Sequence, residues 1–232
     1  MPRTPESALR VLSREVIECT LCPRLVEHRT NMARIKRRAY LAWDYWGKPV
    51  PPFGDLRAQL LVIGLAPAAH GGNRTGRMFT GDRSGDFLYR ALYETGFASQ
   101  SSSVSREDGL TLTDAYITAA VRCAPPDNKP LPEEFQNCRR YLEGEIDSLT
   151  RRRVTVALGK LAFDAYLGIL RDRGIIRSRV AFPFGHNVLH DIPGAGILIA
   201  SYHPSQQNTS TGKLTADMLR QVFERARAIL QE

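Results

Sequence analysis

Short apolar segments alternate with helical patterns along this chain, and no other feature of the sequence constrains the fold as strongly. The apolar segments are residues 60–64, 115–118, 154–158 and 196–200. Apolar residues at helical spacing mark residues 5–18, 24–40, 86–95, 133–149 and 160–171, and a closing helix with its cap near Thr211. Strands that alternate with helices form parallel sheets covered on both faces, so we predict an α/β fold with three α/β/α layers and a central four-stranded parallel sheet.

The size and composition of the chain fit one domain with a full core. Of its 232 residues, 43% are hydrophobic and 24% are charged, as in ordinary globular proteins. We therefore predict a single domain over residues 1–232. No apolar run approaches the roughly 20 residues that span a bilayer, and residues 1–14 lack the apolar part of a signal peptide. We expect a monomer in the cytoplasm, without membrane contact.

The charge of the chain favours a polyanionic partner. Lys and Arg number 32 against 24 Asp and Glu, which gives a formal net charge of +8. Nucleic acid is therefore the leading class of partner, although charge alone cannot name it. One basic cluster consists of Arg34, Lys36, Arg37 and Arg38. It is either a solvated helix surface or a surface that faces DNA.

Four cysteines form two pairs, and the chain has no others. Cys19 and Cys22 are separated by two residues, and Cys123 and Cys138 by fourteen. Disulfides are disfavoured in a reducing compartment, so a four-thiolate zinc site or an iron–sulfur cluster is the natural interpretation, with buried free thiols as the alternative. The wide second pair favours iron, and we predict one 4Fe-4S cluster that fixes an N-terminal helical segment to the domain.

Two strand ends carry polar or glycine-rich strings. The first strand continues into Gly64-Leu-Ala-Pro-Ala-Ala-His70, and the fourth continues into Ser201-Tyr-His-Pro-Ser205. In parallel sheets, ligands bind at the carboxyl edge of the strands, so both strings are expected to border one crevice. Taken singly, the first string is an ordinary turn and His203 an ordinary structural histidine.

Taken together with the cysteines, the two strings resemble the uracil-DNA glycosylase superfamily, whose first motif has the form Gly-x-x-Pro and whose later motif is His-Pro-Ser. The resemblance covers nearly the whole chain. Gly71-Gly-Asn-Arg-Thr-Gly-Arg77 and Cys123-Ala-Pro-Pro-Asp-Asn-Lys-Pro130 are similar to the fifth, cluster-bearing family of this superfamily. The resemblance implies the glycosylase fold and a bacterial or archaeal protein of the cytoplasm and nucleoid.

The resemblance also implies a reaction, namely hydrolysis of the N-glycosidic bond of a deaminated base in single- or double-stranded DNA. The base must leave the stack, and Phe79 matches the aromatic residue against which the family stacks it. His203 matches the donor that stabilises the departing base. An ordinary core phenylalanine is the alternative interpretation of Phe79.

The first motif departs from the wider superfamily at the position that holds the attacking water. Relatives carry Asp, Asn or Glu there, whereas this chain offers Leu65, Ala66 and Ala68 along the pocket wall. Another polar residue must compensate. We predict that Asn73 orients the water, in preference to Asn128, which shares its loop with Cys123.

The second departure concerns the base edge. Cluster-bearing relatives specific for uracil have Asn at the position of Ala119. Alanine cannot read the base, so we expect uracil to be accepted together with other deaminated bases such as hypoxanthine.

DNA phosphates are expected to contact the loop after His203 and two basic residues, that is Ser205, Gln206, Gln207, Arg77 and Lys213. One alternative is a non-enzymatic iron–sulfur module that binds DNA. A metal-dependent nuclease is a second alternative, but it needs carboxylates at the strand ends, and these are almost absent.

Overall fold

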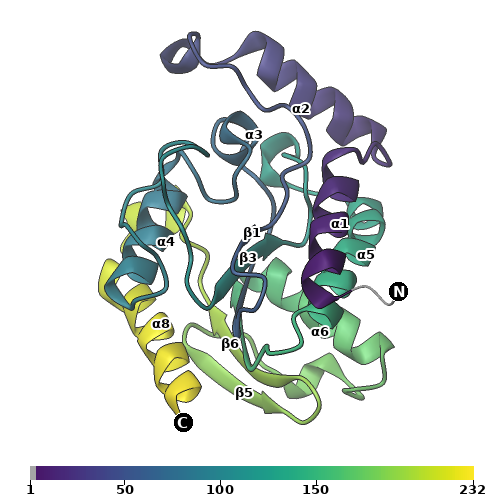
Figure 1. The fold of residues 1–232 in the computed structure, drawn as a ribbon, viewed down its shortest axis with the longest axis vertical. Coiled ribbons are helices and arrows are strands. Elements are labelled where there is room, and N and C mark those ends of the chain that lie inside the picture. The colour runs from purple at the N-terminus through teal and green to yellow at the C-terminus, as the bar shows by residue number, and fades with distance from the viewer. Residues whose placement is uncertain (1–3) are drawn as a thin grey trace.

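The computed structural model describes residues 4–232. Its centre is a six-stranded sheet with the order β1-β3-β2-β4-β6-β5 (Figure 1). The four inner strands are parallel to one another, and the two edge strands are antiparallel to their neighbours. The strands are β1 (Phe53–Gly54), β2 (Leu60–Gly64), β3 (Ala115–Ala119), β4 (Val154–Leu158), β5 (Val188–Ile192) and β6 (Gly196–Ser201). The predicted α/β class and the parallel centre are confirmed.

The two edge strands were not predicted, and each lacks the signal that revealed the inner strands. Strand β1 has only two residues, and β5 is mostly half-buried, with a single buried residue, Ile192. Every residue of β2, β3 and β4 is buried. A fully buried strand has apolar residues at successive positions, which a sequence shows directly.

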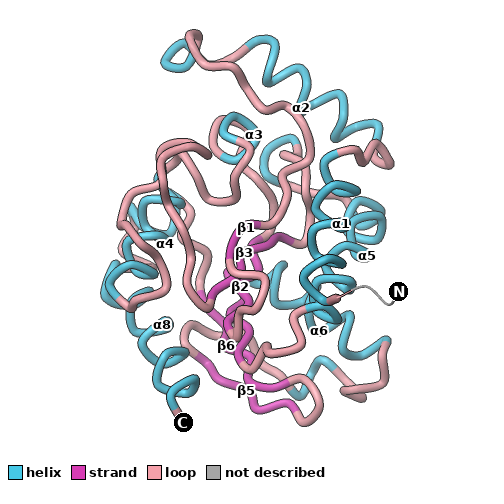
Figure 2. The backbone as a smooth tube through the Cα atoms, in the orientation of Figure 1, coloured by secondary structure: helices cyan, strands magenta, loops and turns pink. Residues whose placement is uncertain are grey.

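The helices of the structure are α1 (Pro5–Ile17), α2 (Pro23–Ile35), α3 (Gly72–Thr75), α4 (Arg83–Glu94), α5 (Pro132–Ser148), α6 (Lys160–Asp172), α7 (Gln206–Ser210) and α8 (Ala216–Gln231). Three short 3₁₀ turns are η1 (Arg38–Tyr40), η2 (Pro126–Asn128) and η3 (Arg179–Ala181). Figure 2 shows the strands in the centre and much of the loop structure above and beside them.

Alternate residues of each inner strand face two separate cores. Leu60 and Val62 face the core formed with α4 and α8, whereas Leu61 and Ile63 face the core formed with α1, α5 and α6. The pleat of a strand points successive side chains to opposite faces, so both faces need a cover of helices. The three-layer arrangement follows from this pattern.

Two predicted helix boundaries were wrong for local backbone reasons. The helix expected over 24–40 ends at Ile35, because Lys36 has φ +56°, a left-handed conformation that interrupts the helix. The closing helix begins after Thr215, whose side chain accepts a hydrogen bond from the Met218 amide, rather than near Thr211. Thr211 instead follows the short helix α7.

The N-terminal helices pack on an element far along the chain. Helix α1 lies against α5, and the Arg24 guanidinium donates to both carboxylate oxygens of Glu134 at 2.8 Å.

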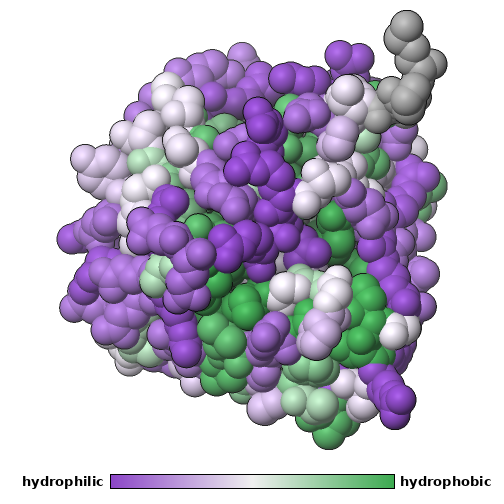
Figure 3. Space-filling view, turned by 60° about the horizontal axis from the view of Figure 1, so that its bottom comes forward, coloured by the Kyte–Doolittle hydropathy of each residue, from purple (hydrophilic) through white to green (hydrophobic). Residues whose placement is uncertain are grey.

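Figure 3 turns the bottom of the molecule forward, where hydrophobic residues gather in the lower half of the face and hydrophilic residues cover much of the rest. No helix within residues 4–232 is both long and apolar enough to cross a membrane.

Candidate active site

The two strings that follow β2 and β6 leave the sheet at the same edge. Strand β4 lies between them, because it pairs with β2 on one side and with β6 on the other. The residue after β4 is Gly159, with φ +94°, and a Cβ there would lie 3.2 Å from the Cβ of His203. Glycine lets the end of β4 pass beneath His203 without a clash.

Phe79 is held in an unusual position. Its φ of +51° is left-handed, and it is half-buried whereas every other residue of 71–80 is buried. A Cβ at Gly64 would meet the Phe79 ring at 2.7 Å, and one at Gly85 would meet the Phe79 carbonyl oxygen at 1.9 Å. These two glycines therefore make room for Phe79. A strained bulky residue persists only where its surroundings impose the conformation, and such residues concentrate at functional sites.

The structure brings Phe79 and His203 together. Their ring centroids are 5.9 Å apart, with the planes inclined by 33°. Burial lowers the pKa of His203 to about 4. The imidazole is therefore neutral at physiological pH, with one ring nitrogen a donor and the other an acceptor. The Asn208 side chain donates to the His203 carbonyl oxygen at 2.8 Å and fixes the backbone of this residue.

The three alanines that were expected to line the pocket, Ala66, Ala68 and Ala119, lie at or just after the carboxyl ends of β2 and β3. Ala119 is the last residue of β3, is paired in register with Gly64, and is buried. Ala66 is half-buried and packs against the small apolar core that contains Cys123 and Cys138, and Ala68 is half-buried in the turn before α3. The Ala68 carbonyl oxygen accepts from the amides of Gly71 and Asn73.

Asn73 lies on α3 with its amide group oriented by the backbone. The side-chain nitrogen donates to the Arg29 carbonyl at 3.1 Å and to the Ala69 carbonyl at 3.4 Å. The side-chain oxygen is buried and has no hydrogen-bond partner among residues 4–232. A buried acceptor left in this state is a position that a water molecule can satisfy. Asn128, the other candidate, is exposed in η2.

Asp82 is an acid at this edge that sequence reasoning missed. One carboxylate oxygen accepts from the Gly85 amide at 3.0 Å and caps α4, while the other lies against Gly71, where a Cβ would approach it to 1.8 Å. Burial raises the pKa of this carboxyl group. The sequence signal was present, because Asp82 precedes a helix as N-cap residues do. Its contact with the first motif depends on the fold of residues 71–82.

Arg77 does not occupy the position that was expected of it. Its side chain is buried, and its nitrogens donate to Asp108, Thr80 and Ser103 at 2.7 to 3.0 Å. Burial alone would raise the pKa of Asp108, but hydrogen bonds from Arg77 and the backbone hold it at about 2. Arg77 therefore braces the loop of residues 103–108, and its placement does not fit a contact with DNA phosphate.

The other expected DNA contacts lie on the loop that follows His203. Ser205 caps α7 by accepting from the Asn208 amide, and Gln206 and Gln207 are exposed at the start of that helix. Lys213 is exposed, with its ammonium 5.0 Å from the centre of the Tyr202 ring. This arrangement leaves the amide groups and the ammonium free for a ligand beside His203.

The four cysteines converge in one region, which we call the cysteine cluster. Cys22, Cys123 and Cys138 share a small apolar core with Leu25 and Val121. Burial raises the pKa of Cys123 to about 12, and repulsion from Cys138, Cys19 and Cys22 adds to it. Burial also raises the pKa of Cys138, to about 11. Three of the four cysteines therefore share one core, and Cys19 is near enough for its charge to raise the pKa of Cys123.

Two arginines lie close to the cysteine cluster. Among residues 4–232, no three His, Cys, Asp or Glu side chains are arranged as the ligands of one metal ion. Buried thiolates need nearby positive charge, and both Arg29 and Arg122 lower the pKa of cluster thiols. Arg122 is itself buried and pairs with Glu145 at 2.7 Å. Four cysteines are the donor set that an iron–sulfur group would need, with Arg29 and Arg122 beside them.

Comparison with known proteins agrees with this fold. The family model described as the uracil DNA glycosylase superfamily matches residues 51–227. A "Type-5 uracil-DNA glycosylase" of Pyrobaculum aerophilum is 48% identical over 92% of this chain and 89% of its own length. One of Thermus thermophilus is 49% identical over 91% and 93%. A "Type-4 uracil-DNA glycosylase" of Thermotoga maritima is 30% identical over 71% and 68%. The chain belongs to the uracil DNA glycosylase superfamily, and within it to the fifth family.

Proposed function

We propose that this protein is a monofunctional uracil-DNA glycosylase that leaves an abasic site. In this reaction, the oxygen of a water molecule bonds to the sugar C1′, the bond from C1′ to the base nitrogen breaks, and the base leaves with a proton. The observation that carries the proposal is the pair of Phe79 and His203, 5.9 Å apart at the edge where β2 and β6 end. Membership of the fifth family supports uracil in DNA as the substrate.

Each of these two side chains has a physical task in the reaction. A flipped base must be held against a flat surface once it has left the stack, and the Phe79 ring supplies one. Negative charge develops on the departing base, so a donor aimed at a base oxygen lowers the barrier. The neutral imidazole of His203 can donate in this way without the cost of burying a charge.

One assay tests the proposal against its alternatives. A duplex with a single uracil, incubated with the protein and then treated with alkali, breaks at the uracil position if an abasic site has formed. Strand breakage that needs magnesium but no alkali would instead indicate a nuclease. Binding without any product would indicate a DNA-binding module.

Ala119 supports a broader choice of base. Its methyl group cannot hydrogen-bond to a base edge, and it ends the strand next to the one that carries Gly64. We infer that other deaminated bases such as hypoxanthine are excised in addition to uracil, because the pocket loses little when the base edge changes.

Replacing Ala119 by Asn is expected to sharpen the choice of base. The new amide can pair with a uracil edge, and unpaired polar groups disfavour a base that does not match. We expect the ratio of uracil to hypoxanthine cleavage rates to rise by about 10-fold, measured under single turnover in duplexes of identical flanking sequence. Ala119→Ser, which adds a small polar group of shorter reach, is the control. An unchanged ratio in Ala119→Asn would place base selection elsewhere.

Asn73 is the residue that we assign to the attacking water. Replacing Asn73 by Ala is expected to slow cleavage by roughly 10- to 1,000-fold, the range for loss of positioning or of one polar contact. Affinity for DNA should change little, because the side chain is buried. Asn31→Ala removes a surface amide of α2 and serves as the control. Full single-turnover activity in Asn73→Ala would exclude this role and direct attention to Asp82 and Asn128.

We further propose that the cysteine cluster holds one 4Fe-4S group on Cys19, Cys22, Cys123 and Cys138. The shared apolar pocket, the mutual influence of the four thiols and the adjacent arginines support it. Such a group would join the segment before α2 to the loop after β3 and to α5. We also expect the protein to act as a monomer on DNA in the cytoplasm or nucleoid, in line with the bacterial and archaeal origin of its relatives.

A further inference from the structure

A basic and aromatic segment crosses the edge of the molecule next to the candidate site. We call residues 36–48 the arm; they run from the end of α2 through η1 to the loop before β1. Arg37, Arg38 and Lys48 are exposed along it, and Arg34 is exposed just before it. Within residues 4–232, none of these four side chains forms an ion pair. Asp44 is the single acid of the arm.

The arm is fixed to the helix that carries Asn73. The amides of Trp46 and Gly47 donate to the carbonyl oxygens of Arg74 and Asn73 at 2.9 and 3.0 Å. The Arg74 guanidinium lies 3.9 Å from the centre of the Tyr40 ring and 4.1 Å from that of Trp43. The basic side chains of the arm therefore project from a rigid support.

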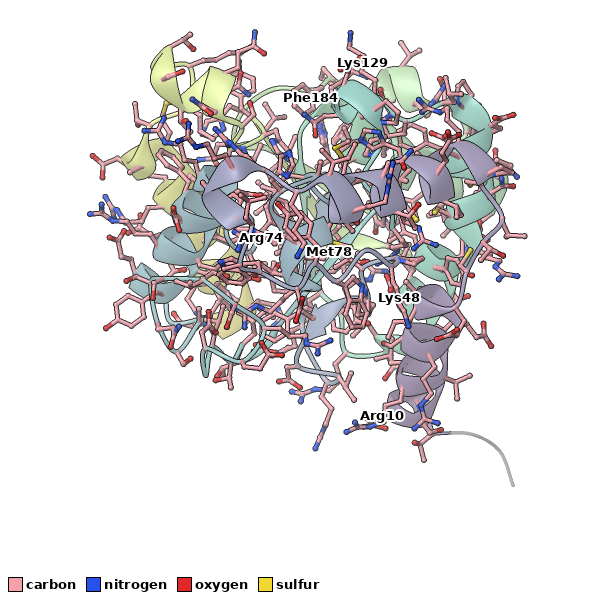
Figure 4. All side chains as sticks on the ribbon, turned by 90° about the horizontal axis from the view of Figure 1, so that it is seen from above. Arg10, Lys48, Arg74, Met78, Lys129 and Phe184 are labelled. Carbon is pink, nitrogen blue, oxygen red and sulfur yellow. The ribbon has the colours of Figure 1, made fainter. Side chains whose placement is uncertain are left out.

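Arg74 connects the arm to both ends of the loop that contains Phe79. Its Nε donates to the His70 carbonyl at 2.8 Å, and one Nη donates to the Gly81 carbonyl. On the arm side, the Tyr45 hydroxyl lies 3.0 Å from Nδ1 of His70. Figure 4, which views the molecule from above, shows Arg74 beside the arm, with Met78 close by. The arm thus lies along one border of the Phe79 loop.

We propose that the arm binds backbone phosphates of the DNA duplex that flanks the flipped base. This inference rests on the proposed function, because DNA is the polyanion that the site would receive. A duplex that places one nucleotide beside Phe79 extends across the same edge in both directions. Arginines without acidic partners, on a support that does not have to be ordered on binding, suit such a contact. The exposed side chains of Ile35 and Leu41 lie among these charges and would face the sugars.

The test compares two double variants of equal charge. Arg37→Gln with Arg38→Gln removes two charges from the arm. Arg57→Gln with Arg151→Gln removes two exposed charges that precede β2 and β4, at the opposite edge of the sheet. Affinity for an undamaged duplex is measured by fluorescence anisotropy over a range of salt concentrations, after the melting temperatures have been shown to match the wild type.

The arm variant is expected to bind about 10-fold more weakly at low salt, and its slope of log affinity against log salt should become shallower by about 1.8. The control variant should keep the wild-type affinity and slope. Equal slopes in the wild type and the arm variant would overturn the inference. Because the duplex contains no uracil, the measurement is independent of the reaction: a wild type that binds normally but releases no uracil would contradict the proposed function alone.

Discussion

Replacing His203 by Ala is expected to slow uracil excision by about 100- to 1,000-fold, because one donor aimed at developing charge is lost. The half-buried imidazole faces Phe79, and no charged group contributes to its low pKa. Single-turnover rates at saturating enzyme measure the chemical step directly. Binding to undamaged duplex should stay close to that of the wild type.

The same residue gives a prediction for pH. The pKa of His203 is lowered to about 4, so its neutral form persists from pH 8 down to about pH 5. The excision rate should therefore show no decline through pH 6.5, where an ordinary histidine gains its proton. His28→Ala, at a partly exposed histidine of α2, is a control with unchanged rate. A rate that follows protonation near pH 6.5 and loses this step in His203→Ala would contradict a neutral donor.

Replacing Cys138 by Ala is expected to lower the melting temperature by about 10 to 20 °C, since the free energy of binding a metal group is part of the free energy of folding. Iron bound per protein should fall from about four ions to near zero in the same preparation, as expected for a group that needs four thiolates. Anaerobic purification followed by metal analysis and thermal unfolding measures both quantities.

Val121→Ala is the matched control, because Val121 is buried in the same apolar core but offers no ligand. It should lower the melting temperature by only a few degrees and keep its iron. If Cys138→Ala were no less stable than Val121→Ala, the thiol would have only a packing role. Stoichiometric zinc in the wild type would exclude the iron–sulfur group.

Sequence reasoning succeeded where burial imposes a pattern on the residues. Strands β2 and β4 had the predicted bounds, because five successive buried positions require an uninterrupted apolar run. The edge strand β5 pairs on one side only and carries His190 and Asp191, so its sequence resembles a loop. Lys36 ended a helix that its neighbours favoured, and propensity does not anticipate a left-handed residue of that kind.

In the candidate site, too, some positions follow from local sequence patterns and others depend on contacts between distant segments. The strand ends predicted that the strings Gly64–His70 and Ser201–Ser205 would border one crevice, since parallel strands end together. Phe79 was added only by the resemblance to the family. Arg77 was assigned to DNA because arginines favour phosphate, but its partners Ser103 and Asp108 lie 26 and 31 residues further along the chain. Contacts over such separations depend on how loops fold back, which local patterns do not encode.

The docking of α1 and α2 onto α5 has a consequence during synthesis. Arg24 and Glu134 are 110 residues apart, and a ribosome adds roughly 5 to 20 residues per second, so about 5 to 20 s pass before Glu134 is made. For that time Leu9 and Leu25, both fully buried in the finished protein, lack the side chains of α5 that share their cores. The nascent chain therefore presents apolar helices to the cell before β4, the partner of β2 in the centre of the sheet, has been made, which is the interval in which a chaperone would be of most use.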